Sequence, residues 1–485
     1  MPEVSTTTLI NWQGLQIEVT PEGDLAAVVA QGSGRRLLDG LRLDLPEPWQ
    51  RGTVEVLATE VEQQWAHPSG VTAVTRQVFD ETWTVRVTLL NRGEEAADVP
   101  APRLRLRAPW PTRRWLAGGE ASISIDAGQD GRQLVLTQLR GHATARDGEM
   151  LLAPDPLRLA AATDQGPAQF LISWRAAWLE SANQAARVLP AWWPAKVALP
   201  SGEEVILGLP DAGVSADKGV ELVTQDEDTW ISGPIGRHVV HVHDRLGVTD
   251  LELWWAPPIE HAVHRRASEL IEVTDPRTCL PWEAWIVANA VPLLGSPAQE
   301  YLLSAAEERL ARSGPTHPMD ALVVASQLTL TPDDDLWSGL LDLVGEMPTQ
   351  PGSQLALIHA RLLAMQQGRV TSMPKAAPAP ADLSAVERAL VAVEEAVLMP
   401  PDQPDETMWQ VAGLLGAGLP GDTVGLVRLA QVYATTALLP EHWNFLERWP
   451  VPLNVARESV ANRVLASLGR PEGDEGLAWL LAGLN

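Results

Sequence analysis

Alternation of apolar and polar residues dominates the chain up to about residue 255. Trp83, Val85, Val87 and Leu89 alternate with polar residues and are followed by a turn-like segment at 91–93. A period of two predicts a half-buried β-strand. Similar runs are separated by turn residues, without helical patterns between them, at 14–20, 54–58, 71–79, 103–107, 121–125, 133–137, 169–174, 205–209 and 251–255. This half is therefore predicted to be an antiparallel β-sandwich, one large or two smaller.

The period changes to that of a helix after Pro257-Pro258. Apolar residues then recur three and four positions apart, as in the stripe Leu383, Val386, Leu390, Val393 and Val397. Such stripes joined by short loops predict helical hairpins packed into an α/α array. The fold class is thus multidomain, β then α. The predicted parts are a β-sandwich at 1–190, its continuation or a second small β domain at 191–256, a first helical part at 257–372, a Pro/Ala linker at 373–381 and a second helical part at 382–485.

Charge and cysteine content narrow the classes of function. Among the 485 residues, 62 Asp and Glu exceed 36 Lys and Arg, and the net charge is −26. Such a field repels nucleic-acid phosphates, so we expect no nucleic-acid partner. No apolar run is long enough to predict membrane insertion. The single cysteine, Cys279, excludes an internal disulfide and is expected to be a small buried residue. With no recognisable targeting segment, we expect a cytoplasmic location.

Tryptophan is unusually frequent, with 20 Trp against three Phe and two Tyr. Trp83 and Trp255 fall on the apolar sides of strands and are predicted to lie in the core. Trp192 and Trp193 lie between two prolines and are the best candidates for an exposed pair. Exposed indole rings could contact a glycan, whereas the alternative is that Trp packs where other proteins use Phe and Tyr.

Arginines gather on one predicted strand face. Arg103, Arg105 and Arg107 alternate with leucines, and Arg113 and Arg114 follow closely. Together they could form a patch for an anion or an acidic partner. Cross-strand pairing with carboxylates such as those of Glu60 and Glu62 is the favoured interpretation.

Histidines cluster once, at 238–243. On a strand, His241 and His243 share one face, and two imidazoles at this spacing are weak candidates for metal ligands. No third ligand is fixed by spacing, so a hydrogen-bonded histidine face is favoured and no metal is predicted. No sequence motif predicts a cofactor either.

Several carboxylates in the helical half lie near indole rings, as in glycosidase clefts. The candidates are Glu283, with Trp282 and Trp285 beside it as possible ligand-binding residues, and the catalytic candidates Asp405 and Glu441. Acidic residues at helix starts are also ordinary capping residues. The triplet 333–335 is interpreted in that way, with Thr331 as the expected cap.

The order of a large sandwich, a helix near 259–273 and then helical hairpins resembles glycoside hydrolases and phosphorylases that join a β-supersandwich to an α/α helical domain. The resemblance lies in architecture over the whole chain, and no catalytic segment matches, so it assigns no catalytic residue. It implies a cleft at the junction of the two halves.

Two hypotheses follow from these patterns. The first is a non-enzymatic interaction or scaffold protein whose sandwich and helical surfaces bind a protein partner or a saccharide. The second is a carbohydrate-active enzyme, and the sequence leaves enzyme status and oligomeric state open. The first is favoured because no motif brings a set of catalytic residues together.

Overall fold

The computed structural model describes residues 7–108, 112–117, 120–126, 132–146, 149–164, 166–179, 192, 194, 196–209, 213–244, 247–312, 317–369, 383, 385–397, 411, 425–437, 439 and 453–483. Antiparallel strands occupy the described chain up to Ala256, and helices occupy the part that follows. The predicted fold class, β then α, is therefore confirmed. The main division between two compact units falls between Trp254 and Trp255.

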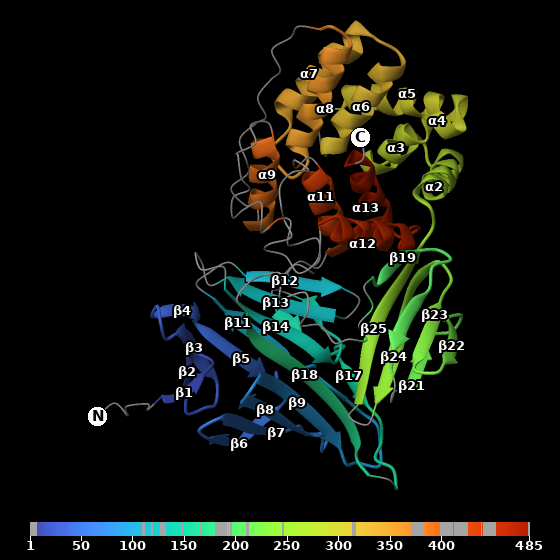
Figure 1. Cartoon of the computed structure of the whole chain (residues 1–485). Coiled ribbons are helices and arrows are strands. Elements are labelled where there is room, and N and C mark those ends of the chain that lie inside the picture. The colour runs from blue at the N-terminus through green and yellow to red at the C-terminus, as the bar shows by residue number, and fades with distance from the viewer. Residues whose placement is uncertain are drawn as a thin grey trace. The chain divides into compact units, whose positions relative to one another are not determined.

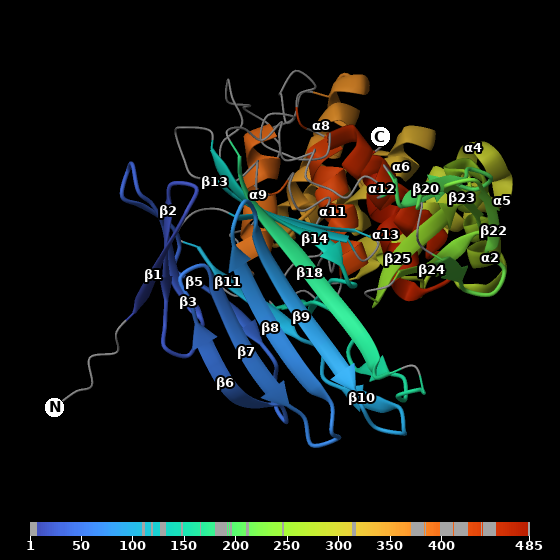
Figure 2. The ribbon, with the colours of Figure 1, turned by 60° about the horizontal axis from the view of Figure 1, so that its bottom comes forward.

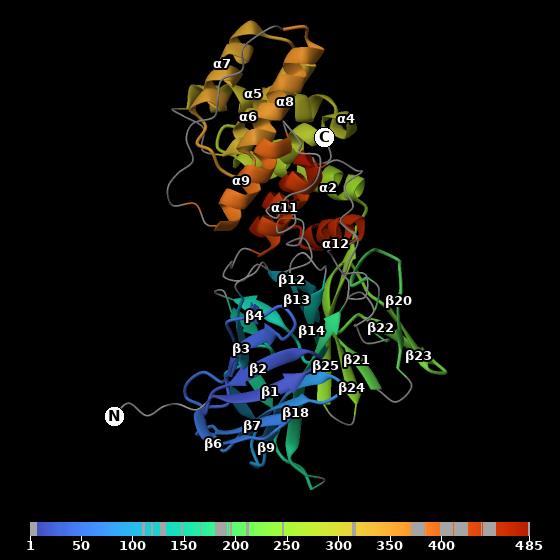
Figure 3. The ribbon, with the colours of Figure 1, turned by 60° about the vertical axis from the view of Figure 1, so that its left-hand side comes forward.

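Two eight-stranded antiparallel sheets form the sandwich (Figures 2 and 3). The first sheet contains, in spatial order, β1 (Thr8–Trp12), β2 (Leu15–Val19), β3 (Leu25–Ala30), β5 (Gly40–Asp44), β11 (Arg103–Arg107), β16 (Glu149–Leu151) and β15 (Thr144–Arg146), with β4 (Arg35–Leu38) beside β3. The second contains β12 (Thr112–Ala117), β13 (Glu120–Asp126), β14 (Gln133–Arg140), β18 (Ala168–Leu179), β9 (Trp83–Asn91), β8 (Thr72–Phe79), β7 (Glu60–Ala66) and β6 (Gln50–Val56). A short ribbon pairs β10 (Ala97–Val99) with β17 (Leu157–Leu159).

One apolar cluster fills the space between these sheets. It joins Ile17 and Leu41 of the first sheet to Trp83 and Trp174 of the second, all of them buried. Burial of each such side chain contributes about 1.5–3 kcal/mol. The core position predicted for Trp83 is confirmed, because alternate residues of β9 point into this cluster.

A smaller pair of sheets follows in the same unit. The four-stranded sheet has the order β19 (Ala198–Pro200), β25 (Gly247–Ala256), β24 (Gly236–Asp244) and β21 (Gly213–Ala216). The three-stranded sheet has the order β20 (Val205–Gly208), β23 (Asp228–Ser232) and β22 (Glu221–Gln225). Leu207 and Ile231 of the smaller sheet and Leu253 and Trp255 of the larger one are buried, which confirms the core position predicted for Trp255.

The second unit consists of packed helices (Figure 1). They are α2 (Ile259–Val273), α3 (Pro281–Asn289), α4 (Val291–Leu294), α5 (Ser296–Ala311), α6 (Pro318–Leu330), α7 (Asp334–Glu346), α8 (Ser353–Gln366), α9 (Ala385–Val397), α11 (Gly425–Ala437), α12 (Leu453–Ala466) and α13 (Pro471–Ala482). Neighbours in sequence pack as hairpins, for example α5 with α6 and α6 with α7. No described helix is long and apolar enough to span a membrane.

The last helix, α13, packs against helices from the beginning of the array as well as against α11. Helix α13 contacts α3 and α11. The Trp285 Nε1–H donates to the carbonyl oxygen of Ala478 at 3.1 Å, and Arg266 of α2 forms an ion pair with Asp474 at 2.8 Å. The stretches on either side of 373–381 therefore share one core, while residues 373–381 themselves lie outside the described part of the chain.

The acidic triplet 333–335 begins α7, as predicted. Asp333 is the N-cap and its Oδ1 accepts the Leu336 backbone N–H at 2.8 Å, while Asp334 and Asp335 lie in the first turn. The expected cap, Thr331, is wrong, because Thr331 instead ends α6. A carboxylate is a stronger acceptor for the first N–H groups and also favours the positive end of the helix dipole.

We predict that residues 1–256 fold without the helical unit. The two large sheets enclose their own apolar cluster, so the fragment keeps the burial that stabilises it. The expected result is a soluble fragment with a β-type circular dichroism spectrum and a cooperative unfolding transition. A spectrum with substantial helix, or a fragment without a transition, would contradict the boundary.

Candidate binding surfaces

The predicted arginine stripe lies on the outward side of the first sheet. Leu104 is buried between Arg103 and Arg105, so the arginines of β11 point away from the core. On the neighbouring strand β5, Arg42 lies directly opposite Arg105, and Asp44 lies opposite Arg103. We call the surface formed by Arg42, Arg103, Arg105 and Arg107 the arginine face.

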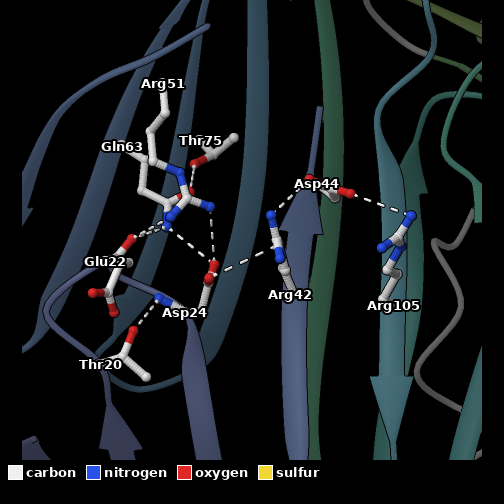
Figure 4. Close-up of polar contacts among 9 residues, drawn as sticks. All are labelled: Thr20, Glu22, Asp24, Arg42, Asp44, Arg51, Gln63, Thr75 and Arg105. Carbon is white, nitrogen blue, oxygen red and sulfur yellow. Dashed lines mark hydrogen bonds and ion pairs between the residues drawn. The ribbon is translucent and has the colours of Figure 1, made fainter. Parts of the chain in front are cut away.

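Arg42 and Arg105 share one carboxylate. Asp44 lies 3.1 Å from Nη2 of Arg42 and 3.4 Å from Nη2 of Arg105 (Figure 4). The side chains of the two arginines remain 47% and 45% exposed. The shared carboxylate offsets the repulsion between two like charges placed directly opposite each other.

The same network continues to the second sheet through Asp24 (Figure 4). Asp24 forms an ion pair with Arg51 of β6 at 3.4 Å and accepts a hydrogen bond from Gln63 of β7, and Arg42 lies 3.9 Å away. Gln63 in turn accepts a hydrogen bond from the hydroxyl of Thr75 at 3.0 Å. These contacts join the two sheets beside the arginine face and fix the position of Arg42.

The carboxylates expected to pair with the stripe are elsewhere. Glu60 belongs to β7 in the other sheet, where it binds Arg76 of β8 at 2.7 Å and Arg76 lowers its pKa. Glu60 therefore does not pair with the stripe, because sequence alone does not assign a strand to one of two sheets. Cross-strand pairing with a carboxylate does occur, between Arg105 and Asp44 of the neighbouring strand. Arg113 and Arg114 lie on β12 at the edge of that second sheet, and their side chains are outside the described part.

The two candidate histidines share a face of β24. Val240 and Val242 are buried, whereas His241 and His243 point away from them with ring centroids 6.3 Å apart. His241 Nδ1 lies 2.6 Å from Asp250, and His243 Nε2 lies 2.7 Å from the Ser215 hydroxyl. Within the described residues, no group of three or more His, Cys, Asp or Glu is arranged to hold a metal ion.

A nearby carboxylate is also held by basic partners. Glu252 of β25 forms an ion pair with Arg237, and its carboxylate lies 3.3 Å from Nε2 of His142. Burial alone would raise its pKa, but the hydrogen bond from His142 and the charge of Arg237 lower the pKa of Glu252 to about 2. This carboxylate therefore stays ionised at neutral pH and links β25 to the loop containing His142.

The candidate residues on α3 make contacts within the helical unit that stabilise its fold. The Glu283 carboxylate accepts the Leu280 backbone N–H at 2.8 Å and so caps its own helix, α3. Trp285 is buried in the helical core, and Cys279 is buried as expected. Trp282 is half-buried and contacts His317 edge-on at 5.7 Å.

The other candidates are not brought into one site by the described contacts. Trp192 is half-buried within a turn. Trp193, Asp405 and Glu441 lie outside the described part of the chain.

An exposed apolar row on the three-stranded sheet was not recognised in the sequence. Ile206 and Val223 are each the direct partner of Trp230 across neighbouring strands, so all three side chains share one face. They are 44%, 61% and 37% exposed. The sequence feature that indicates this exposed row is Val205-Ile206-Leu207. In a strand with one buried face, three successive apolar residues place at least one of them on the outward face.

Comparisons with known proteins leave function open. No family model and no curated protein matches the chain. Among solved structures, a polysaccharide lyase is similar over 95% of this chain and 82% of its own, with 10% identity and a TM-score of 0.49. A TPR-domain-containing protein from Parabacteroides distasonis is similar over 90% and 88%, with 10% identity and a TM-score of 0.22. Both scores are below 0.5, so neither similarity bears on the function of this chain.

Proposed function

We propose that this chain is a non-enzymatic interaction protein and that its arginine face binds an acidic segment of a protein partner. The observation that carries the proposal is the alignment of four arginines on β5 and β11, two of them directly opposite each other. Asp44 and Asp24 offset part of the repulsion among these side chains, and the four guanidinium groups outnumber these two carboxylates. In a chain with a net charge of −26, the alignment gives a local surface of the opposite sign.

The chemistry of the face favours carboxylates. A guanidinium group offers a planar fork of donors that matches a carboxylate, and it stays charged at any physiological pH. Arg42 is held by Asp44 and Asp24, which lowers the entropy lost when a partner binds. The four arginines provide no aromatic ring for stacking on a sugar, so an acidic polypeptide is favoured over a saccharide.

A labelled oligoglutamate peptide tests this function in the full chain. We expect binding at an ionic strength of about 0.15 M, where screening over about 8 Å weakens repulsion from distant carboxylates more than contact pairs. Arg105→Gln and Arg107→Gln are each expected to weaken binding about three- to tenfold, the effect of losing one charge pair. Fluorescence anisotropy of the peptide measures the change.

The matched control is Arg158→Gln, which removes one positive charge elsewhere on the same unit. Arg158 lies on β17 with its side chain 74% exposed, so its loss should leave affinity unchanged. Equal weakening by all three variants would mean that the peptide senses only net charge. That result, or the absence of binding, would refute the arginine face as a docking surface.

A further inference from the structure

The three-stranded sheet has one face in the core and one face outward. Val205 and Leu207 of β20 and Ile231 of β23 are buried, and the residues between them point the other way. Outward positions of such a sheet are normally polar. The row formed by Ile206, Trp230 and Val223, which we call the apolar row, crosses all three strands instead.

Carboxylates surround this row. On the same face, Asp228 is the direct partner of Gly208 on one side and of Gln225 on the other. The Asp228 carboxylate lies over Gly208, since a Cβ added there would be 3.6 Å from Oδ1. Glu221 of β22 and Glu204, just before β20, are exposed at the opposite end of the strands.

The sequence around the three strands is acidic throughout. Between residues 201 and 232 the sequence has eight Asp and Glu and a single basic residue, Lys218. Asp226 and Glu227 form the turn between β22 and β23 and are exposed as well. The surface therefore has an apolar centre and an acidic rim. An apolar centre with a polar rim is typical of surfaces that bind a partner.

We infer that the apolar row is the docking site for a basic polypeptide segment whose arginine or lysine side chains alternate with apolar ones. Charge complementarity selects this occupant, because an acidic partner is repelled by the rim and a neutral saccharide gains nothing from its charge. A guanidinium can stack on the exposed indole of Trp230. Its methylene chain then packs on Ile206 or Val223 while its charge meets Asp228.

This surface is independent of the arginine face. It lies on a different sheet, has the opposite charge and takes a partner of the opposite sign. Failure of one proposal therefore leaves the other unaffected.

The test uses the full chain and two labelled peptides of equal length, one alternating Arg with Leu and one alternating Glu with Leu. The Arg-Leu peptide is expected to bind, and Trp230→Ala to weaken it about tenfold or more, as for a central aromatic contact. Asp228→Asn should weaken it less and reduce its dependence on salt. Because Trp230 is partly exposed, Trp230→Ala is expected to keep the circular dichroism spectrum of the parent.

Leu57→Ala provides the matched control, since Leu57 is an apolar residue of the same unit, 56% exposed, directly after β6. Affinity unchanged in Leu57→Ala and reduced in Trp230→Ala would support the site and exclude general attraction of a cation to an acidic protein. Equal affinity for the parent and Trp230→Ala would overturn it. So would preferential binding of the Glu-Leu peptide, or of neutral oligosaccharides in a manner that needs Trp230 and is independent of salt.

Discussion

Replacing Arg309 with methionine is expected to destabilise the helical unit by about 3–5 kcal/mol, the effect of removing one partner from a buried ion pair. Arg309 of α5 is buried and lies 3.1 Å from the Asp320 carboxylate of α6. Its guanidinium also donates to the carbonyl oxygens of Ala305 and Leu280 at 2.9 and 3.2 Å. Methionine has a similar volume but no donor, so the buried Asp320 carboxylate loses its ionic partner, although its Oδ2 still accepts the His317 backbone N–H at 3.0 Å.

Urea unfolding followed by the helical circular dichroism signal measures this effect. The double variant Arg309→Met/Asp320→Asn should be more stable than Arg309→Met alone, because it leaves no unpaired buried charge. Arg265→Met is the matched control on α2, since Arg265 is 57% exposed and 4.0 Å from Glu269. Its loss should change the free energy of unfolding by less than about 1 kcal/mol. Equal effects of Arg309→Met and Arg265→Met would contradict the buried ion pair.

The periodicity of apolar residues predicted the strands and helices well, because each period reflects the burial of one face of the element. Trp83 and Trp255 lie in the core, and the triplet 333–335 begins a helix, as their positions indicated. The fold class followed from the change of period near residue 257. These inferences need only the immediate neighbours of a residue along the chain.

Pairings between distant strands and helices could not be predicted in this way. Arg105 meets Asp44, 61 positions earlier, because β11 joins β5, and nothing in either strand specifies that neighbour. The buried pair of Arg309 and Asp320 was missed for the same reason. The exposed Trp230 was also missed, because an indole in an alternating strand is expected to face the core.

Two buried titratable groups give the helical unit opposite responses to pH. Glu394 of α9 is buried, and its oxygens accept the Gly352 backbone N–H at 2.8 and 3.1 Å, at the start of α8. Gly352 has a φ of +93°, and an added Cβ would be 2.2 Å from the ring of Trp479, so glycine is required there. Burial raises the pKa of Glu394 to about 7, although its hydrogen bonds oppose the shift.

His317 shifts in the other direction. It caps α6, with its Nδ1 accepting the Met319 backbone N–H at 3.2 Å, and its ring contacts Trp282 and Trp479. Burial lowers the pKa of His317 to about 4, although the nearby charge of Asp320 opposes the shift. The folded state therefore keeps this ring neutral at any pH above that value.

The sign of each contribution follows from linkage. The raised pKa of Glu394 gives stability that is complete below the ordinary value of 4.5 and is lost as the pH rises through about 7. The lowered pKa of His317 gives stability that is complete above the ordinary value of 6.5 and is lost as the pH falls through about 4. Each shift corresponds to about 3 kcal/mol at most. Between pH 4.5 and 6.5 the contributions of Glu394 and His317 to the free energy of unfolding change in opposite directions, so they partly cancel in the parent.

Single substitutions should separate the effects of Glu394 and His317 on how the free energy of unfolding depends on pH. Glu394→Gln keeps an oxygen acceptor for Gly352, and His317→Asn keeps a favourable N-cap for α6. Relative to the parent, Glu394→Gln should gain up to about 3 kcal/mol in the free energy of unfolding as the pH rises from 4.5 to above 7. His317→Asn should gain a similar amount as the pH falls from 6.5 toward 4. Urea unfolding of the parent, both single variants and the double variant across this range measures the four curves. If the curves of the single variants run parallel to that of the parent, neither group titrates in the folded state as its burial requires.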